Sequence, residues 1–254
     1  MSGKKRKSQK KQLNPRFFGI LCCGAVLLVA LVVGLTHCQN GTPEDPTDPP
    51  ATAPTVAHSQ IDPDTSIDLG SNLVITGTGS YAGMFMENGS NEIVSGVQMI
   101  SLRNNSAAAL QYAVITLEYA DGESAVFEVS NIPAGGRAVV LEASAAAYRA
   151  EKAVKTRVEN VVFMDKMPLQ EDKIKIQGLD GAMNVTNISG EDITSDIYIY
   201  YKYAAGDVLY GGITFRAKIE GGLKKDEVRQ LSSEHFDAKG SKVVMITLVD
   251  KNAG

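Results

Sequence analysis

The stretch YAVITLEYADGESAVFEV, residues 112–129, constrains the fold most, because its apolar side chains recur at every second position. A period of two belongs to a β-strand, whose side chains point alternately to the two faces of a sheet. Asp121 and Gly122 interrupt the alternation with residues suited to a hairpin turn. We therefore predict two antiparallel strands. Their apolar face carries Ala113, Ile115, Leu117 and Tyr119, then Ala125, Phe127 and Val129; the opposite face carries Tyr112, Val114, Thr116 and Glu118.

The same order of features returns 84 residues later, in SDIYIYYKYAAGDVLYGGITFRAKIEGG. This spacing aligns Ile115 with Ile199, Leu117 with Tyr201, Tyr119 with Tyr203 and Gly122 with Gly206. LRNNS (102–106) precedes the first stretch as VTNIS (185–189) precedes the second. A tandem duplication explains the recurrence, since repeated elements in one order are the signature of repeated structural units.

Short strands with closely spaced turn signals predict β-sandwiches of immunoglobulin-like type. We place the first sandwich at residues 66–167 and the second at residues 168–254. The fold class is thus all-β, with one exception inside the sandwiches. The Ala-rich stretch EASAAAYRAEKA (142–153) predicts a helix of one to three turns.

The order of strand, acidic-glycine turn, strand and proline-glycine turn resembles FxLYD-type sandwich modules of bacterial surface proteins. LEYADG (117–122) stands at the position of that motif, without its Leu-Tyr-Asp core. Residues 80–250 also resemble membrane-anchored surface proteins of Clostridia. These resemblances imply a surface location and a sandwich fold, and they imply no activity.

Residues 17–36 form an uncharged run rich in Leu, Val and Ala. As a helix its 20 residues would span about 30 Å, the thickness of the hydrocarbon core of a bilayer. Seven Lys and Arg residues and no acid precede it in residues 1–16. A basic flank stays in the cytoplasm, so we predict a single-pass signal anchor whose C-terminal domains are extracellular.

Two other readings of the N-terminus remain open. A cleaved secretory signal has a shorter apolar region and a small-residue cleavage site, and GLTHCQ (34–39) offers no clean one. A lipoprotein signal would end at Cys38, but His37 occupies the position that Gly, Ala or Ser usually takes. We therefore predict an uncleaved anchor, with a lipoprotein anchored at Cys38 as the alternative.

Residues 37–65 hold six of the nine prolines, no Lys or Arg and few bulky apolar groups. Such a segment cannot bury enough surface to fold, so we predict a disordered, extended stalk. Beyond Cys38 the chain has no cysteine, which suits an extracytoplasmic protein of a Gram-positive bacterium better than a disulfide-rich eukaryotic ectodomain. Beyond residue 16 the chain has 18 basic and 29 acidic residues, and this acidic balance argues against nucleic-acid binding.

Few side chains suggest chemistry. Residues 77–83, GTGSYAG, lack the spacing of a phosphate loop and predict a flexible turn between strands. The histidines His37, His58 and His235 are scattered and make no metal set. Two acidic clusters, Asp62/Asp64/Asp68 and Glu191/Asp192/Asp196, lack a calcium-loop pattern and predict solvated surface. We predict no catalytic residue, cofactor or metal, and we interpret five Asn-x-Ser/Thr sites, starting at Asn40, Asn88, Asn104, Asn184 and Asn187, as chance matches.

One pair of side chains suggests a binding face. If Ile197, Ile199, Tyr201 and Tyr203 face the core, Tyr198 and Tyr200 project from the opposite face. Exposed rings two apart can stack on sugars or on an apolar partner surface, or they can pack against the first unit. The sequence thus predicts a non-enzymatic, membrane-anchored binding or structural protein of the cell envelope. Its partner would be wall polymer or envelope protein, and an envelope enzyme is the rival hypothesis.

Overall fold

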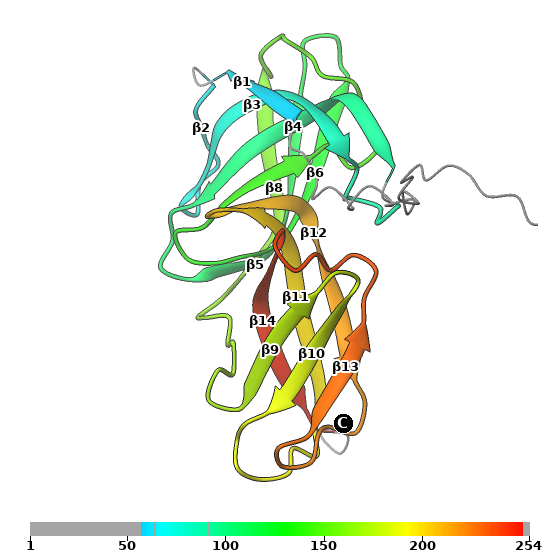
Figure 1. Ribbon diagram of the computed structural model, residues 1–254. Coiled ribbons are helices and arrows are strands. Elements are labelled where there is room, and N and C mark those ends of the chain that lie inside the picture. Colours follow the sequence, from blue (N-terminus) through cyan, green and yellow to red (C-terminus); the bar gives the residue numbers. More distant parts are fainter. Residues whose placement is uncertain (1–56, 63–64, 91, 251–254) are drawn as a thin grey trace, which may run out of the picture. The chain divides into compact units, whose positions relative to one another are not determined.

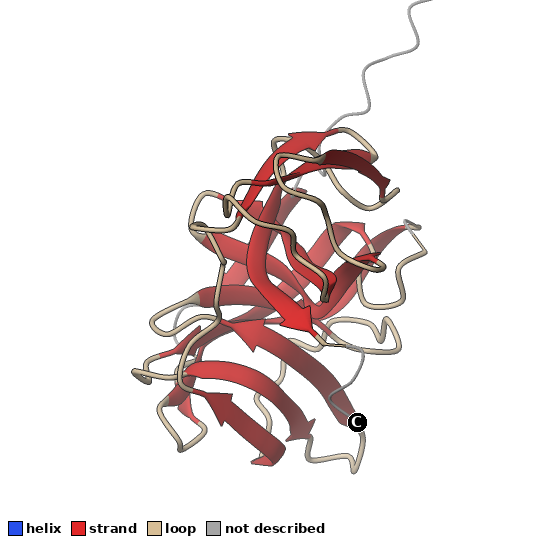
Figure 2. Cartoon of the chain, turned by 90° about the horizontal axis from the view of Figure 1, so that it is seen from below, coloured by secondary structure: helices blue, strands red, loops and turns tan. Residues whose placement is uncertain are grey.

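A computed structural model describes residues 57–250 except 63–64 and 91 (Figure 1). The predicted tail (1–16), anchor (17–36) and first part of the stalk lie outside the described residues. The described part is all-β and contains no helix, and its sheets are open (Figure 2). Nothing in this part is a helix long and apolar enough to cross a membrane. The all-β class predicted from the sequence is therefore confirmed for the described residues.

The first half of this part, residues 73–164, forms two facing layers of three strands. One layer consists of β3 (Leu73–Met84), β4 (Ile93–Asn104) and β7 (Arg137–Leu141), in that order. The other consists of β6 (Ser124–Ile132), β5 (Ala109–Glu118) and β8 (Lys155–Met164). Buried apolar side chains from both layers make one core cluster.

The second half, residues 174–249, repeats this pairing strand for strand. β9 (Ile174–Leu179), β10 (Ala182–Asn187) and β13 (Val228–Ser232) pair in the order β9-β10-β13, as β3-β4-β7 do. β12 (Val208–Ile219), β11 (Asp196–Ala205) and β14 (Ser241–Val249) pair in the order β12-β11-β14, as β6-β5-β8 do. Figure 1 shows β9, β10 and β13 in front of β11, β12 and β14, with the second core between them.

A parallel pairing of β7 with β12 joins the two halves into one sheet. The resulting order, β1-β3-β4-β7-β12-β11-β14, begins with β1 (Ala57–Asp62) and runs through both repeats. β2 (Ile67–Asp68) pairs with β3 beside this path. Several apolar side chains of β4 and β7 that point away from the first core are also buried. They form a third apolar cluster at the junction of the two halves. Met99, Val139 and Leu141 of the first half meet Tyr203 of the second half there.

The alternation read from residues 112–129 is confirmed. The seven side chains assigned to the apolar face are all buried in the first core, and Tyr119 is the most exposed of those on the first strand at 3%. The opposite-face residues Tyr112, Val114, Thr116 and Glu118 are half-buried. The turn is also as expected, since Gly122 adopts a φ of 89° between β5 and β6.

The predicted helix at residues 142–153 is wrong, because this segment runs irregularly along β4 beyond the end of β7. Gln98 of β4 makes two hydrogen bonds to this segment. The Gln98 N–H donates to the Ala146 carbonyl (2.8 Å), and the Gln98 Oε1 accepts from the Arg149 N–H (2.7 Å). Ala145 has a φ of 60°, which a right-handed helix cannot contain. Pairing with β4 thus overrides the helix propensity of the alanines.

Two segments predicted to lack regular structure are strands. Residues 77–83 are part of β3 rather than a turn, since their backbone pairs with β4 and small and hydroxyl side chains alternate across the two faces. Residues 57–62 form β1 (Ala57–Asp62) on the edge of β3, so the predicted stalk ends earlier than Thr65. The stalk was predicted from composition, which indicates how much apolar surface a segment can bury. An edge strand such as β1 is held by backbone hydrogen bonds, which do not depend on composition.

Candidate functional site

Tyr198 lies on the outer face of β11 beside two cations of β12. The Arg216 guanidinium carbon is 5.3 Å and the Lys218 Nζ is 5.5 Å from the centre of its ring. Lys218 also makes an ion pair with Asp196 at 2.9 Å, and this bonded carboxylate raises the pKa of the ammonium group. The half-buried tyrosine is therefore the centre of a patch with one aromatic and two cationic side chains, which we call the Tyr198 patch.

Tyr200 has a different environment, although it is also half-buried. It packs, together with Ala204, against the core cluster of the first half. This position matches the alternative in which the ring serves packing between the units. The structure therefore does not bring Tyr198 and Tyr200 together as one exposed pair of rings.

The strongest electrostatic feature is a lysine buried inside the sheet. Lys202 of β11 is fully buried, and its Nζ donates to the backbone carbonyls of Gly211 (2.9 Å), Gly212 (2.9 Å) and Ile213 (2.6 Å). These three residues belong to a bulge of β12, residues 211–214, because Tyr201 pairs with Phe215 and Tyr203 with Tyr210.

Glu87, from the loop between β3 and β4, accepts hydrogen bonds from two N–H groups of the same bulge. Its carboxylate accepts from Gly212 at 2.8 and 2.9 Å, from Ile213 at 3.1 Å and from Leu141 of β7 at 2.9 Å. Burial raises the pKa of Glu87, while these backbone donors and the charge of Lys202 lower it. Glu87, Lys202 and the bulge thus form one polar unit, the junction lock, which links the two halves.

The bulge also packs directly against β6 of the first half. A Cβ on Gly212 would lie 1.7 Å from the Glu128 carbonyl oxygen, so only glycine fits there. Next to it, the Ser130 hydroxyl donates to the Gly212 carbonyl at 2.8 Å and lies 2.8 Å from the Thr214 hydroxyl. Ser130 and Thr214 are 84 residues apart, so corresponding positions of the two repeats touch.

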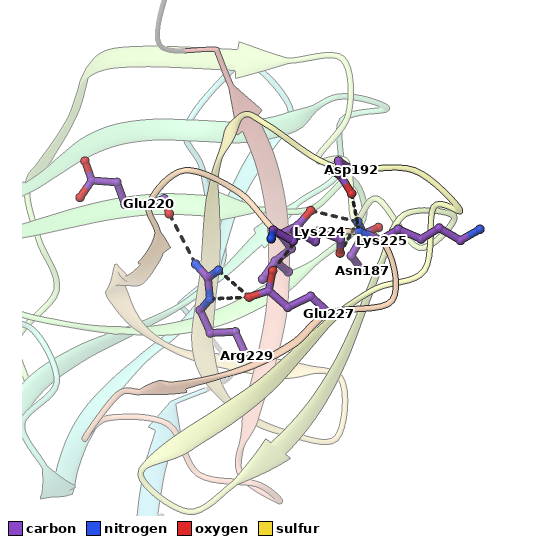
Figure 3. A network of polar contacts seen from close by, with 8 residues as sticks. Asn187, Asp192, Glu220, Lys224, Lys225, Glu227 and Arg229 are labelled. Carbon is purple, nitrogen blue, oxygen red and sulfur yellow. Dashed lines mark hydrogen bonds and ion pairs between the residues drawn. The ribbon is translucent and has the colours of Figure 1, made fainter.

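A buried asparagine holds corresponding turns in both halves. The Nδ2 of Asn187 donates to the carbonyls of Glu191, Leu223 and Lys224 at 2.7, 3.1 and 3.0 Å. Figure 3 labels Asn187 and Lys224. The Nδ2 of Asn104 donates in the same way to Ala108, Ile132 and Pro133 at 2.9, 3.2 and 3.1 Å. Each asparagine ties the turn that follows its own strand to the turn that precedes β7 or β13. Both side chains are fully buried, which rules them out as glycosylation sites in the folded chain.

The histidine and the acidic residues considered in the sequence analysis take part in packing, hydrogen bonds and ion pairs within the fold. The His235 ring stacks on Phe215 with ring centres 4.6 Å apart. Asp196, predicted as solvated surface, is instead buried, and its carboxylate accepts from the Gly221 N–H at 2.8 Å and pairs with Lys218. In the same predicted cluster, Asp192 is exposed and accepts from the Lys225 N–H at 2.7 Å (Figure 3). Within the described residues, no group of three or more His, Cys, Asp or Glu side chains could hold a metal ion.

Sequence reasoning missed the cations of the Tyr198 patch and both members of the junction lock. A signal for the lock was present, since Lys202 interrupts IYIYYKYA and Glu87 interrupts MFMEN with a charge inside an apolar run. That the two charges act on the same bulge had no signal in the sequence, because 115 positions separate them. Comparisons of this chain with protein-family models, with curated proteins and with solved structures found no match.

Proposed function

We propose that the chain is a single-pass, membrane-anchored, extracytoplasmic binding or structural protein of a Gram-positive cell envelope, without enzymatic activity. One observation carries this proposal most: two sandwich-like repeats share a single sheet and a buried junction lock. Two repeats fixed to one another suit a body that presents a surface at a distance from its anchor. The basic tail, the apolar run and the proline-rich segment supply the anchor and the stalk.

The proposal includes two immunoglobulin-like units, residues 66–167 and 168–254. Their identical strand pairing supports a common origin by duplication. The units depend on each other, because Leu209 and Val244 of the second half belong to the core cluster of the first. We therefore expect residues 66–254 to unfold as one body rather than as two.

Protease treatment of intact cells tests the topology. We expect epitopes in residues 66–254 to disappear while a tag on the N-terminus stays protected, since the basic flank is retained in the cytoplasm. Detergent-permeabilised cells are the control, in which both ends should be cut. A C-terminal tag that survives on intact cells and is lost after permeabilisation would overturn the proposed localisation.

Fatty-acid labelling separates the two forms of anchoring. A signal anchor predicts no label, whereas a lipoprotein predicts label that disappears in Cys38→Ser. If label is present and is lost in Cys38→Ser, the chain is a lipoprotein and not a signal-anchored protein. The proposed extracytoplasmic location would still hold.

The Tyr198 patch is the proposed contact surface for wall polymer or an envelope protein. We expect Tyr198→Ala to weaken binding to isolated cell envelope while the free energy of unfolding falls by no more than about 1 kcal/mol per cation contact, the size of an exposed cation–π interaction. Tyr112→Ala, on the outer face of β5 in the first half, is the matched control and should bind normally. Cosedimentation with envelope and thermal unfolding measure the two effects. Equal binding by both variants would exclude the patch.

A further inference from the structure

A cavity of about 460 Å³ lies where β4 and β7 of the first half meet β12 and β14 of the second. Its walls carry the cations Arg103, Arg137 and Lys242, the carboxylate Asp207 and the turn at Gly135. This volume lies within the range of small-molecule sites in proteins. Three positive charges and one negative charge give the walls a net charge of +2, in a chain whose sequence beyond residue 16 is acidic.

The two arginines are directly opposite each other on neighbouring strands. Arg103 of β4 and Arg137 of β7 are antiparallel partners, so their side chains leave the same face of the sheet. Like charges in this position destabilise a sheet. No described residue forms an ion pair or hydrogen bond with the side chain of either arginine or of Lys242. The two exposed arginines therefore keep like charges opposite each other, and Asp207 offsets only part of the positive charge of the cavity wall.

The second half shows that the fold does not require these charges. Arg103 directly precedes the buried Asn104, and Thr186 directly precedes the corresponding Asn187. Thr186 pairs with Val228 as Arg103 pairs with Arg137. The same architecture is thus built with an uncharged pair, so the strand pairing does not depend on the two arginines.

The wall of the cavity is held in place before any ligand arrives. The Asn104 N–H donates to the Gly136 carbonyl at 2.9 Å, and its side chain bonds the Pro133 carbonyl at 3.1 Å. Gly135 has a φ of 69°, and a Cβ there would meet no atom within 4 Å, so the turn leaves open space on its outer side. A preformed wall lowers the entropy cost of binding.

We propose that this cavity binds a phosphate monoester that carries neighbouring hydroxyl groups, such as a sugar phosphate or polyol phosphate. A phosphate monoester has a charge of about −1.5 to −2 at pH 7, which matches the net charge of the walls, whereas a carboxylate has one charge. Two guanidinium groups offer paired donors to phosphate oxygens. Asp207 accepts hydrogen bonds from hydroxyl groups. The inference does not rest on the proposed function, because the cavity is the same whatever anchors the chain.

Titration calorimetry of the full chain in neutral detergent, at low salt, tests the site with glycerol 3-phosphate as the probe. We expect saturable binding that weakens as salt rises. Glycerol and acetate should not bind, and inorganic phosphate should bind more weakly because it lacks the hydroxyl groups. Equal affinity for inorganic phosphate would contradict the role of Asp207, and absence of binding would overturn the site.

The variant Arg103→Thr with Arg137→Val copies the residue pair of the second half and keeps the architecture. We expect affinity for glycerol 3-phosphate to fall about tenfold or more for each arginine, since a hydrogen bond to a charged group contributes about 1.5–3 kcal/mol. Its thermal midpoint should equal or exceed that of the unmodified chain, because a repulsive pair is removed. Unchanged affinity in this variant would place the binding elsewhere and refute the proposal.

Discussion

Lys202→Met is expected to lower the free energy of unfolding by about 2–6 kcal/mol, because the buried carbonyls of Gly211 and Ile213 lose their donor at about 1–3 kcal/mol each. The methionine fills a similar volume, so the loss comes from polar groups and not from a cavity. Three carbonyls of the β12 bulge lose the donors that Lys202 supplies, and Glu87 keeps its buried carboxylate without a nearby cation. Denaturant titration of the full chain in detergent measures the loss.

The hydrogen bonds of the β12 bulge explain why the loss of stability in Lys202→Met should be large. The bulge of β12 leaves the ladder to β11, so its N–H and C=O groups need other partners. Glu87 accepts from the N–H groups, and Lys202 donates to the carbonyls. Removing Lys202 takes the donor from the carbonyls of Gly211 and Ile213, whereas the Gly212 carbonyl keeps the Ser130 hydroxyl; each buried group that loses its partner costs about 1–3 kcal/mol.

Two variants test the pairing itself. Glu87→Gln should also destabilise the chain, and the double variant should lose less than the sum of the two single losses, because neither charge is then left alone. Lys242→Met is the control, since Lys242 is the exposed cross-strand partner of Lys202 on β14 and should matter by less than about 0.5 kcal/mol. Additive losses in the double variant would mean that the two charges act separately.

The pH dependence has a definite sign. Burial lowers the pKa of Lys202 from 10.5 to about 7, although the charge of Glu87 opposes the shift. Between these values the unfolded chain binds a proton that the folded chain does not, so the free energy of unfolding rises with pH by up to about 1.4 kcal/mol per unit. This contribution is lost as the pH falls toward 7. Lys202→Met removes the slope, so its loss of stability should be larger at pH 9 than at pH 7.

How much of this fold the sequence predicts depends on the range of the interactions involved. Period-two alternation identified the inner faces of β5 and β6 correctly, because neighbouring positions of a regular strand point to opposite faces. On β11 it was correct for Ile197, Ile199 and Tyr201, but Tyr203 lies in the junction cluster, because the pairing with β12 shifts between Tyr201 and Tyr203. The same alternation gave no hint of the parallel pairing of β7 with β12, which joins residues 137–139 to residues 208–210. Local propensity failed at residues 142–153, where hydrogen bonds to Gln98 and its neighbours decide the conformation.

The same limit applies to the candidate sites. Tyr198 was recognisable because its position follows from the alternation of a single strand. The junction lock and the basic cavity were not, because each combines side chains from both halves. The duplication did not predict the basic cavity, but it helps to interpret it. Arg103 and Arg137 of the first half correspond to Thr186 and Val228 of the second, so the charges are a feature of one half and not a requirement of the architecture.

Tyr201 is expected to be the most sensitive apolar position of the second half. It is 1% exposed, its ring stacks on Phe215 at 5.5 Å between centres, and it meets the edge of Phe236 at 5.1 Å. Its hydroxyl bonds to Ser233 in the segment after β13, so the side chain links the facing sheets of the second core. Its removal would therefore open a cavity and leave a polar partner unpaired.

Tyr201→Ala should lower the free energy of unfolding by about 3–5 kcal/mol, the range for deleting a buried aromatic side chain. Tyr201→Phe keeps the ring contacts and should cost only about 1 kcal/mol, the net contribution of one hydrogen bond. Tyr198→Ala, three positions earlier and on the other face, should also cost only about 1 kcal/mol per cation contact. Urea unfolding of the three variants tests this order. An equal loss for Tyr198→Ala and Tyr201→Ala would show that both faces of β11 are core, and the Tyr198 patch could then not serve as a binding surface.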